Sequence, residues 1–314
     1  MLKATKQLST PNFELSTPVF LTGATGFIGR RLAKCLMAAG ADVAALVLPG
    51  ETALLPDGVR AISGDVTFPE TVTEAIATTQ PGLIVHLAAI GITNPDLPLT
   101  AACDVNVGGV INILDAARRV ETVRRIVLVG SSYEYGARRA DDRLDPFNAY
   151  SASKVAAWAF ARATYNAWGA PVVWTRLFQV YGPGQREKAL IPAAIQAALN
   201  GDDFRMTAGE QQRDFIFVED VVEGLVAATT APGIEGRALD VGTGQLHRIR
   251  AVVERIWALS GARGQILAGA LPYRPGEVPA IPADVDRTRR LTGWESQVEL
   301  ETGLQKTIEA MRET

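Results

Sequence analysis

The sequence of 314 residues is poor in cysteine and histidine, with two of each. Two cysteines, Cys35 and Cys103, cannot build a disulfide framework, and we interpret them as buried structural thiols in a reducing compartment. We interpret His86, within an apolar run, as a core residue. With His247 as the other histidine, no metal site is expected.

The sequence also lacks a basic run, an uninterrupted apolar run and the apolar core of a secretion signal. Lys and Arg number 31 against 34 Asp and Glu, a net charge of -3 that leaves no basic stripe for nucleic acid. No run of about 18 apolar residues is present, so no membrane span is expected. Residues 1–17 resemble a loose tail rather than a signal peptide. We therefore expect a cytoplasmic protein that binds neither nucleic acid nor a membrane.

Short apolar runs alternate with longer helical patterns from Pro18 onward. The expected strands are Val19–Thr22, Val43–Leu48, Arg60–Gly64, Leu83–Ala88, Arg125–Ser131 and Val172–Leu177. The expected helices between them are Phe27–Gly40, Pro69–Thr79, Thr100–Arg119 and Ala149–Gly169. Several runs, such as LIVHLA and RIVLVGS, are apolar throughout, as in strands covered on both faces of a parallel sheet. The order predicts an α/β fold with a Rossmann-type doubly wound parallel sheet.

The pattern loosens after Tyr181. We expect a helix over Ile191–Asn200, a strand over Arg237–Gly242, a helix through Ser260 and a loop over Gly269–Pro282. Because no linker divides the chain, the second lobe is expected to be interleaved with the first. We assign residues 18–181 and about 237–260 to the dinucleotide-binding domain, and about 182–236 and 261–314 to a smaller substrate-binding lobe.

Three glycines follow the first strand and open the first helix, in Thr22–Gly29. Gly23 allows a tight turn, Gly26 lets backbone amides approach a pyrophosphate, and Gly29 lets the helix pack closely on the strand. This arrangement predicts a dinucleotide site. The other residues expected to contact the dinucleotide are Thr25, Phe27, Ile28, Arg30, Asp65, Val66, Leu87, Ala88, Ala89 and Asn106, with Tyr150 and Lys154.

The choice between NAD and NADP depends on the end of the second strand. An acid there would bind the adenosine ribose hydroxyls and repel a 2′-phosphate. The strand Asp42–Leu48 ends without an acid or an arginine, whereas Arg30, and less favourably Arg31, could reach a 2′-phosphate. We therefore lean towards NADP(H) within an NAD(P)(H)-binding site. Asp65 is expected to accept a hydrogen bond from the adenine amino group.

Tyr150 and Lys154 lie four residues apart at the start of a predicted helix, so their side chains share one face. A nearby ammonium stabilises a phenolate and allows proton exchange with a carbinol during hydride transfer. Ser131 ends a buried strand, where its hydroxyl can bind the same substrate oxygen. Asn106 fits equally a local helix bend and a proton relay.

Nine motifs in chain order resemble extended short-chain dehydrogenases/reductases of the nucleotide-sugar epimerase/dehydratase branch. They are TGATGFIG, HLAA, VNVGGVINIL, GSSYEYG, YSASK, RLFQVYGPGQ, RDFIFVEDV, LDVGTG and RPGE, and the resemblance extends from about residue 18 to 300. The resemblance implies that Ser131, Tyr150 and Lys154 are catalytic. It also implies that Gly23, Gly26, Gly29 and Asp65 hold the cofactor. It further implies a homodimer packed through the helices at 100–119 and 149–169.

The same resemblance implies a nucleotide-sugar substrate. Its contacts are expected from Ser132, Tyr133, Gln179, Arg213 and Arg274, the two arginines holding the pyrophosphate. The longer amide of Gln179 stands where the family commonly has Asn. In sugar dehydratases of the branch, the catalytic stretch resembles Thr-Asp-Glu, whereas this chain has Ser131-Ser132-Tyr133 there. The next acid, Glu134, is expected to point into the fold. Dehydration is therefore disfavoured.

Three readings of the function remain. The favoured one is reduction of an NDP-4-keto-6-deoxyhexose with Tyr150 as proton donor, because the missing acid suits a dissociable cofactor. The alternative is an NDP-sugar 4-epimerase with tightly bound NAD. A non-catalytic dinucleotide sensor is a remote third reading, because Ser131, Tyr150 and Lys154 are all present.

Overall fold

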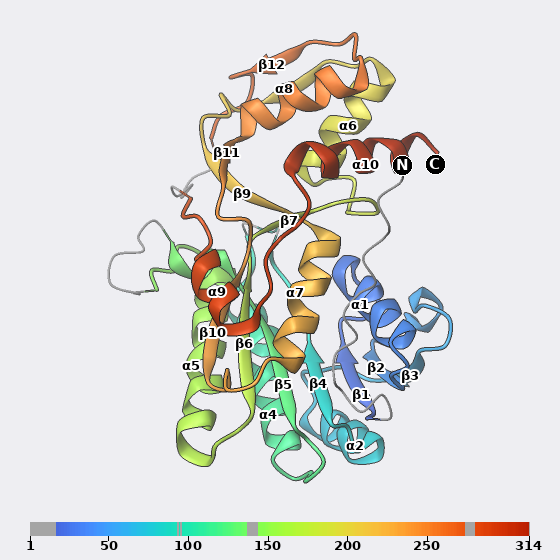
Figure 1. Cartoon of the computed structure of the whole chain (residues 1–314), viewed down its shortest axis with the longest axis vertical. Coiled ribbons are helices and arrows are strands. Elements are labelled where there is room, and N and C mark those ends of the chain that lie inside the picture. The colour runs from blue at the N-terminus through green and yellow to red at the C-terminus, as the bar shows by residue number, and fades with distance from the viewer. Residues whose placement is uncertain (1–16, 93, 95, 137–143, 274–279, 314) are drawn as a thin grey trace.

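The computed structural model describes residues 17–92, 94, 96–136, 144–273 and 280–313. Figure 1 shows two lobes of unequal size. The larger lobe, in the lower part of the view, holds a sheet between helices. The smaller lobe lies above it and contains the C-terminal helix.

The larger lobe is built on a parallel sheet of seven strands. Across the sheet these are β10 (Arg237–Val241), β6 (Val172–Leu177), β5 (Arg125–Ser131), β4 (Leu83–His86), β1 (Val19–Thr22), β2 (Val43–Val47) and β3 (Arg60–Ser63). The chain order reverses between β1 and β4, which confirms the predicted doubly wound sheet. Every residue of β1, β2, β4 and β6 is buried, which explains their unbroken apolar runs.

Helices cover both faces of this sheet (Figure 1). They are α1 (Phe27–Ala38) and α7 (Val218–Thr230) on one face, and α2 (Pro69–Thr79), α4 (Gly109–Ala117) and α5 (Ala149–Trp168) on the other. Leu32 of α1 and Leu225 of α7 belong to one buried apolar cluster, and Ile76 of α2 and Ile113 of α4 to a second. The predicted helices of this lobe are therefore confirmed.

The helix predicted at Thr100–Arg119 is continuous but not uniform. α3 (Leu99–Ala102) leads into a π-helical stretch, Cys103–Gly108, which leads into α4. By length and composition, Leu99–Ala117 could cross a membrane, and 44% of the stretch concerned is buried inside the protein. Because α4 contacts both α2 and α5, we interpret it as a core helix.

The two thiols differ in exposure, and neither forms a disulfide. Cys35 is half-buried in α1, whereas Cys103 is exposed at the start of the π-helical stretch. The expectation of two buried thiols is therefore wrong for Cys103, because the apolar residues around it pack the opposite side of the helix.

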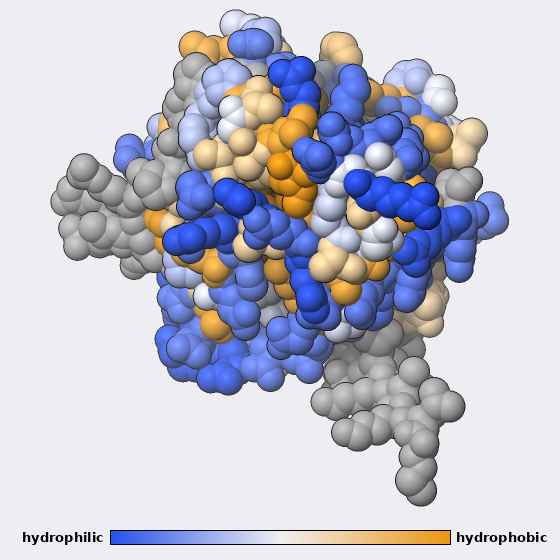
Figure 2. Space-filling model, turned by 90° about the horizontal axis from the view of Figure 1, so that it is seen from above, coloured by the Kyte–Doolittle hydropathy of each residue, from blue (hydrophilic) through white to orange (hydrophobic). Residues whose placement is uncertain are grey.

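The smaller lobe has a core of its own. Its elements are β7 (Gln179–Tyr181), β8 (Phe204–Met206), β9 (Gln212–Phe217), β11 (Leu246–Arg248), β12 (Ile266–Ala268), α6 (Leu190–Asn200), α8 (Ile249–Ser260) and α10 (Leu300–Arg312). β9 pairs with β7 and β11, and β8 pairs with β12. Ile195, Val253 and Leu304, one from each helix, meet in one buried cluster. Seen from above, this lobe presents mostly hydrophilic side chains around a central apolar stretch (Figure 2).

The packing differs from the expected division of the chain at two helices. α7 lies within residues 182–236, which we assigned to the smaller lobe, yet its Val221 and Leu225 pack in the core of the larger lobe. α8 lies within 237–260, which we assigned to the larger lobe, yet its Val252 and Val253 pack in the smaller lobe. Helical periodicity gives each helix an apolar face but does not say which lobe that face covers.

Candidate active site

A reciprocal cap fixes the start of α5, where Tyr150 and Lys154 lie. The Asn148 side chain accepts a hydrogen bond from the Ser151 backbone amide at 2.8 Å, and Ser151 Oγ accepts one from the Asn148 amide at 3.0 Å. Such a cap holds the first helical turn in place. Tyr150 and Lys154, one turn apart, are 6% and 2% exposed.

Ser131 at the end of β5 meets these two residues. The Ser131 side chain lies close enough to Tyr150 to lower the pKa of the phenol. Lys154 Nζ donates to the Val129 carbonyl at 2.9 Å and lies 6.0 Å from the centre of the Tyr150 ring. The structure therefore brings Ser131, Tyr150 and Lys154 together at the carboxyl end of the parallel sheet, where ligands of such folds bind.

Burial sets the proton affinities of this group. It raises the pKa of Tyr150, which the nearby Ser131 side chain partly opposes. Burial lowers the pKa of Lys154 to about 8, although the nearby Glu134 carboxylate opposes this. Lys154 therefore stays largely protonated at neutral pH and places a positive charge beside the phenol, where it favours the phenolate.

Glu134 points into the fold, as expected from the sequence. Its side chain is 0% exposed, and its carboxylate pairs with the Arg176 guanidinium, with 2.7 Å between Nε and Oε2. It also accepts hydrogen bonds from the Ser131 backbone amide at 2.8 Å and from Trp174 Nε1 at 3.0 Å. These contacts hold the backbone at Ser131 and leave this carboxylate turned away from the crevice.

The glycine loop between β1 and α1 fits the pyrophosphate of a dinucleotide. Gly23 has φ +71, and a Cβ there would lie 2.8 Å from the Ala88 nitrogen. A Cβ at Gly29 would lie 2.0 Å from the Gly23 carbonyl oxygen, so larger residues are excluded at both places. Gly26 begins α1 without a side-chain cap, which leaves amides of the first turn open to an anion.

The other predicted dinucleotide residues lie around this loop. Phe27 and Ile28 are half-buried in the first turn of α1, and Arg30 is exposed. Leu87, Ala88 and Ala89 follow β4 directly, and the Ala88 amide donates to Thr22 Oγ1 at 3.2 Å. Val66 is buried. Asp65 Oδ1 already accepts hydrogen bonds from the backbone amide and hydroxyl of Thr67, at 2.8 and 2.9 Å.

Of the two roles considered for Asn106, its contacts favour the local helix bend. It lies within the π-helical stretch, and its side chain is 0% exposed. Its amide group donates to the Ile90 carbonyl and to Ser153 Oγ, and its oxygen accepts from the Ile90 amide. Ser153 Oγ in turn donates to the Tyr150 carbonyl at 2.7 Å. Because both amide hydrogens have protein partners, Asn106 positions the chain after β4 against α5 rather than relaying protons.

His86 is a core residue, as expected. It is 1% exposed, and its Nδ1 lies 2.7 Å from Thr22 Oγ1. Burial, with a contribution from the Lys154 charge, lowers the pKa of His86 to about 3. The ring is therefore neutral at physiological pH.

Four of the predicted substrate residues line one pocket next to Tyr150. These are Ser132, Tyr133, Gln179 and Arg213, joined by Phe147 and Phe178. The Tyr133 ring packs edge-on against the Tyr150 ring, with centroids 6.4 Å apart. The fifth predicted residue, Arg274, lies outside the described residues.

Asp214, next to Arg213 in β9, was not singled out from the sequence. It is 2% exposed, and its carboxylate accepts hydrogen bonds from the amides of Thr243, Gly244 and Ala283. These bonds tie β9 to the segment after β10 and to the segment around Ala283, of which Ala280 and Ile281 line the pocket. The signal in the sequence was the acid directly beside the candidate phosphate-binding arginine.

Glu51 is the second unexpected residue. Its Oε2 accepts a hydrogen bond from Thr25 Oγ1, in the glycine loop, at 2.8 Å. Sequence reasoning considered only the end of the second strand at Leu48, whereas Glu51 follows a Pro-Gly turn. An acid about 20 residues beyond the last glycine was the available signal.

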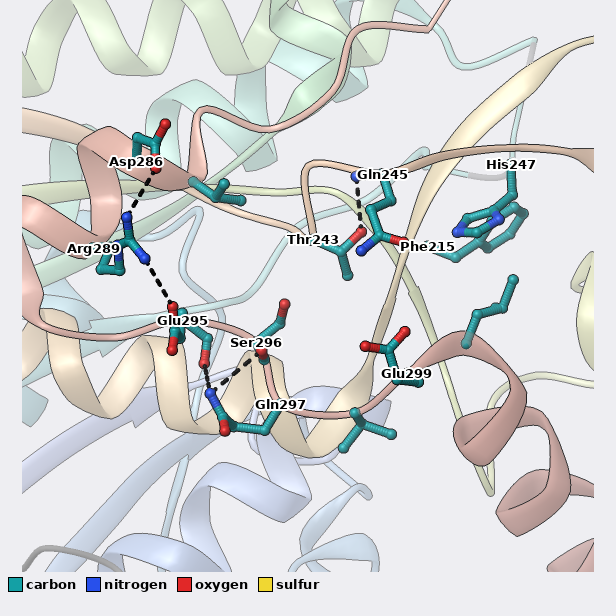
Figure 3. A pocket seen from close by; sticks show the side chains of 13 residues that line it. Phe215, Thr243, Gln245, His247, Asp286, Arg289, Glu295, Ser296, Gln297 and Glu299 are labelled. Atoms are coloured by element: carbon teal, nitrogen blue, oxygen red, sulfur yellow. Dashed lines mark hydrogen bonds and ion pairs between the residues drawn. The ribbon is translucent and has the colours of Figure 1, made fainter.

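A second pocket lies where the segments that follow β10 and α9 (Val285–Thr292) meet α10 (Figure 3). Its lining includes Thr243, His247 and Glu299, and Arg289 bridges Asp286 and Glu295 on its wall. None of the predicted site residues lines it. Among the described residues, no group of three or more His, Cys, Asp or Glu side chains could hold a metal ion.

Comparisons with known proteins agree with this geometry. The model of the NAD dependent epimerase/dehydratase family matches residues 19–242. A UDP-glucose 4-epimerase from Mycolicibacterium smegmatis is 30% identical, with 93% of this chain and 97% of that protein covered. The structure of MoeE5 in complex with UDP-glucose and NAD has a TM-score of 0.84 at 30% identity and covers 94% of this chain and 99% of its own. Epimerase Mth375 from Methanothermobacter thermautotrophicus has a TM-score of 0.85 at 26% identity, with 95% and 93% covered.

Proposed function

The chain belongs to the NAD dependent epimerase/dehydratase family, and from this premise we propose that it transfers hydride to or from the sugar of a nucleotide-sugar. The observation that carries the proposal is the meeting of Ser131, Tyr150 and the buried Lys154 at the carboxyl end of the parallel sheet. The glycine loop and the pocket around Arg213 support it, because they supply places for a dinucleotide and for a second phosphate-bearing ligand.

In the proposed mechanism, Tyr150 exchanges a proton with a hydroxyl on the sugar ring. Ser131 binds the same oxygen and holds it in line with the phenol. Lys154 stabilises the phenolate through its charge and keeps its place through the bond to the Val129 carbonyl. When bound, the nicotinamide accepts or gives the hydride. Glu134 accepts a hydrogen bond from the Ser131 amide and is itself held by Arg176, so these two residues fix the backbone at Ser131.

The substrate proposed is a nucleoside diphosphate sugar. Arg213 lies in the pocket with Ser132, Tyr133 and Gln179. A guanidinium there can donate two parallel hydrogen bonds to the oxygens of a phosphate. From the sequence we add Arg274 as the second phosphate ligand. The rings of Tyr133 and Phe178 give the pocket apolar walls against which a sugar can lie.

Two reactions use these residues. The first is reduction of an NDP-4-keto-6-deoxyhexose, in which Tyr150 protonates the alkoxide formed at C4. The second is 4-epimerisation, in which Tyr150 takes a proton from the C4 hydroxyl and returns it after the 4-keto sugar has rotated to present its opposite face. The similarity to a UDP-glucose 4-epimerase favours the second reaction. Glu51 favours it as well, because the reductase was preferred on the absence of an acid after the second strand, and Glu51 supplies an acid beside the glycine loop. Dehydration is disfavoured, because Ser132 and Tyr133 supply no acid and Glu134 is buried.

The experiment that separates these reactions is the identification of any nucleotide that the purified protein retains. The protein is purified without added cofactor and denatured, and the released nucleotides are resolved by chromatography. Near-stoichiometric NAD indicates a closed redox cycle and hence the epimerase. A protein that releases none but reduces an NDP-4-keto-6-deoxyhexose with added NAD(P)H is the reductase. A protein that neither retains nor binds a dinucleotide would contradict the proposed function.

We also propose a homodimer. Leu99 in α3 and Phe160 in α5 are 71% and 49% exposed, and these two helices contact one another. Two large apolar side chains on adjacent helices suit an interface in which a second copy covers them.

A further inference from the structure

We propose that Tyr135 and Asp240 are positioning residues for the reaction. They join two separate segments that line the substrate pocket and thereby hold the Ser131 hydroxyl at a fixed place relative to a bound sugar. This inference rests on the proposed function, because it presupposes that Ser131 binds an oxygen of that sugar. Neither Tyr135 nor Asp240 lines the pocket itself, so both act through other residues.

The first segment is the short 3₁₀ helix Ser132–Tyr135, directly after β5. Ser132 and Tyr133 line the pocket. The Tyr133 amide donates to Ser131 Oγ at 3.2 Å, which ties the Ser131 hydroxyl to this segment. Tyr135 ends the segment and is buried. A contact made by Tyr135 therefore acts on the segment that holds the Ser131 hydroxyl without touching the ligand.

The second segment contains Ala280 and Ile281, which also line the pocket. Three residues beyond Ile281, the Asp284 amide donates to Asp240 Oδ2 at 3.0 Å. Asp240 lies in β10, and both its backbone amide and its carbonyl form hydrogen bonds with Thr288 Oγ1 of α9. The Asp240 carboxylate therefore anchors the second segment to the central sheet.

Tyr135 connects the two segments at this carboxylate. Its hydroxyl donates to Asp240 Oδ1 at 2.7 Å and accepts a hydrogen bond from Arg176 Nη1 at 3.2 Å. Arg176 Nε in turn donates to Glu134 Oε2 at 2.7 Å, and Glu134 Oε1 accepts from the Ser131 amide at 2.8 Å. An unbroken run of hydrogen bonds thus leads from the Ser131 backbone to Asp240.

Burial makes this run of hydrogen bonds rigid. Glu134, Arg176 and Asp240 are 0%, 5% and 5% exposed, so their charges are stabilised by one another and by hydrogen bonds rather than by water. Displacing any member leaves a buried neighbour without its partner, which costs free energy. The two pocket segments are therefore held at one spacing, and Ser131 is held with them.

The test is a double-mutant cycle between Tyr135→Phe and Ser131→Ala. It uses the NDP-hexose or NDP-4-keto-6-deoxyhexose that the wild-type protein turns over, with the sugar products resolved by chromatography. We expect Tyr135→Phe to lower kcat about tenfold, because a small displacement of a positioning group costs much of the rate. In the Ser131→Ala background the same substitution should cost less than about twofold, because no hydroxyl is left to position. Dinucleotide affinity should not change.

Tyr181→Phe is the matched control. Tyr181 is 1% exposed, and its hydroxyl donates to the Leu300 carbonyl at 3.1 Å. This variant loses the same atom and one buried hydrogen bond, so it should be less stable to heat and keep the wild-type kcat.

Asp240→Asn tests the other end of the link and replaces Tyr135→Phe in the cycle if that variant does not fold. The two carboxylate oxygens of Asp240 accept from the Tyr135 hydroxyl and the Asp284 amide, one each, and asparagine keeps only one such oxygen. We expect a loss of kcat that again depends on the presence of the Ser131 hydroxyl.

Two results would overturn the inference while leaving the proposed function intact. The first is a wild-type kcat in both Tyr135→Phe and Asp240→Asn. The second is an equal loss of kcat with and without the Ser131 hydroxyl, which would show that the link supports the fold and not the position of Ser131. A wild-type protein that turns over no nucleotide-sugar would overturn the proposed function and this inference with it.

Discussion

At the scale of single residues, the surroundings of Lys154 tie its charge to the stability of the fold. Lys154 is 2% exposed, and burial lowers its pKa from 10.5 to about 8. Between these two pH values the unfolded chain binds more protons at this residue than the folded chain does. The free energy of unfolding therefore gains a growing contribution from Lys154, and stability increases, as the pH rises above about 8.

We predict that this gain disappears in Lys154→Met. Urea unfolding at several pH values from 7.5 to about 9.5 should show a more positive slope of stability against pH in the wild-type protein than in the variant. The pH range ends at about 9.5 because Tyr150 has the opposite effect on stability at higher pH. Burial raises the pKa of Tyr150, so the tyrosine of the unfolded chain ionises first and stability falls. Equal slopes in the two proteins would mean that Lys154 is not buried as a charged group.

Sequence reasoning at this scale found the residues that stand in local patterns. Tyr150 and Lys154 are spaced for one helix face, and Ser131 ends a buried strand, so the fold type alone predicts their meeting. Glu51 could not be found in this way, because its role depends on a turn at Gly50 and a contact with Thr25 across the loop. Asp214 likewise depends on three amides brought from two distant segments.

At the scale of elements, the junction of β1 and α1 depends on Gly29. A Cβ there would lie 2.0 Å from the Gly23 carbonyl oxygen, so Gly29→Ala must displace the loop backbone. We predict that the variant loses dinucleotide affinity by at least about tenfold and is less stable by about 1–3 kcal/mol, the usual cost of overpacking. Calorimetric titration and thermal unfolding measure the two effects.

Gly108→Ala is the matched control for this prediction. The nearest atom to a Cβ at Gly108 is the Cys103 carbonyl oxygen at 3.6 Å, an ordinary contact in a backbone conformation open to alanine. The control should bind the dinucleotide as the wild-type protein does. Normal binding by Gly29→Ala would show that the loop does not hold the pyrophosphate.

The elements themselves were predictable where they are long and buried. The central sheet strands β1, β2 and β4 are buried along their whole length, and the helices predicted in this lobe have clear periodicity. All seven sheet strands and these helices were found within two residues of their ends. The strands of the smaller lobe were missed. β7, β8, β11 and β12 have three residues each, and their pairing partners are distant in sequence. A three-residue strand is too short to show alternation.

At the scale of the whole molecule, the candidate substrate pocket joins the two lobes. Ser132 and Tyr133 come from the segment after β5 in the larger lobe, and Arg213 comes from β9 in the smaller lobe. A ligand in this pocket therefore touches both lobes at once. Leu99 and Phe160 both lie on the larger lobe, so the proposed dimer is centred on that lobe.

The dimer predicts the effect of one surface substitution. Leu99→Glu places a charge on the proposed interface and should convert a dimer into a monomer in sedimentation velocity. Phe68→Glu is the control, since Phe68 is also exposed, at 55%, but precedes α2 rather than lying on α3 or α5. A wild-type monomer, or a dimer unaffected by Leu99→Glu, would contradict the proposal.

The central claim is that Tyr150 moves a proton while hydride moves to or from a nucleotide-sugar, and one measurement tests it directly. Wild-type protein and Tyr150→Phe are each mixed with dinucleotide and with NDP-hexoses or NDP-4-keto-6-deoxyhexoses, and the sugar products are resolved by chromatography. We predict turnover by the wild-type protein and a loss of about 10²-fold or more in Tyr150→Phe, with dinucleotide affinity retained. Equal turnover by both proteins, or dinucleotide binding without turnover of any such sugar by the wild-type protein, would contradict the account.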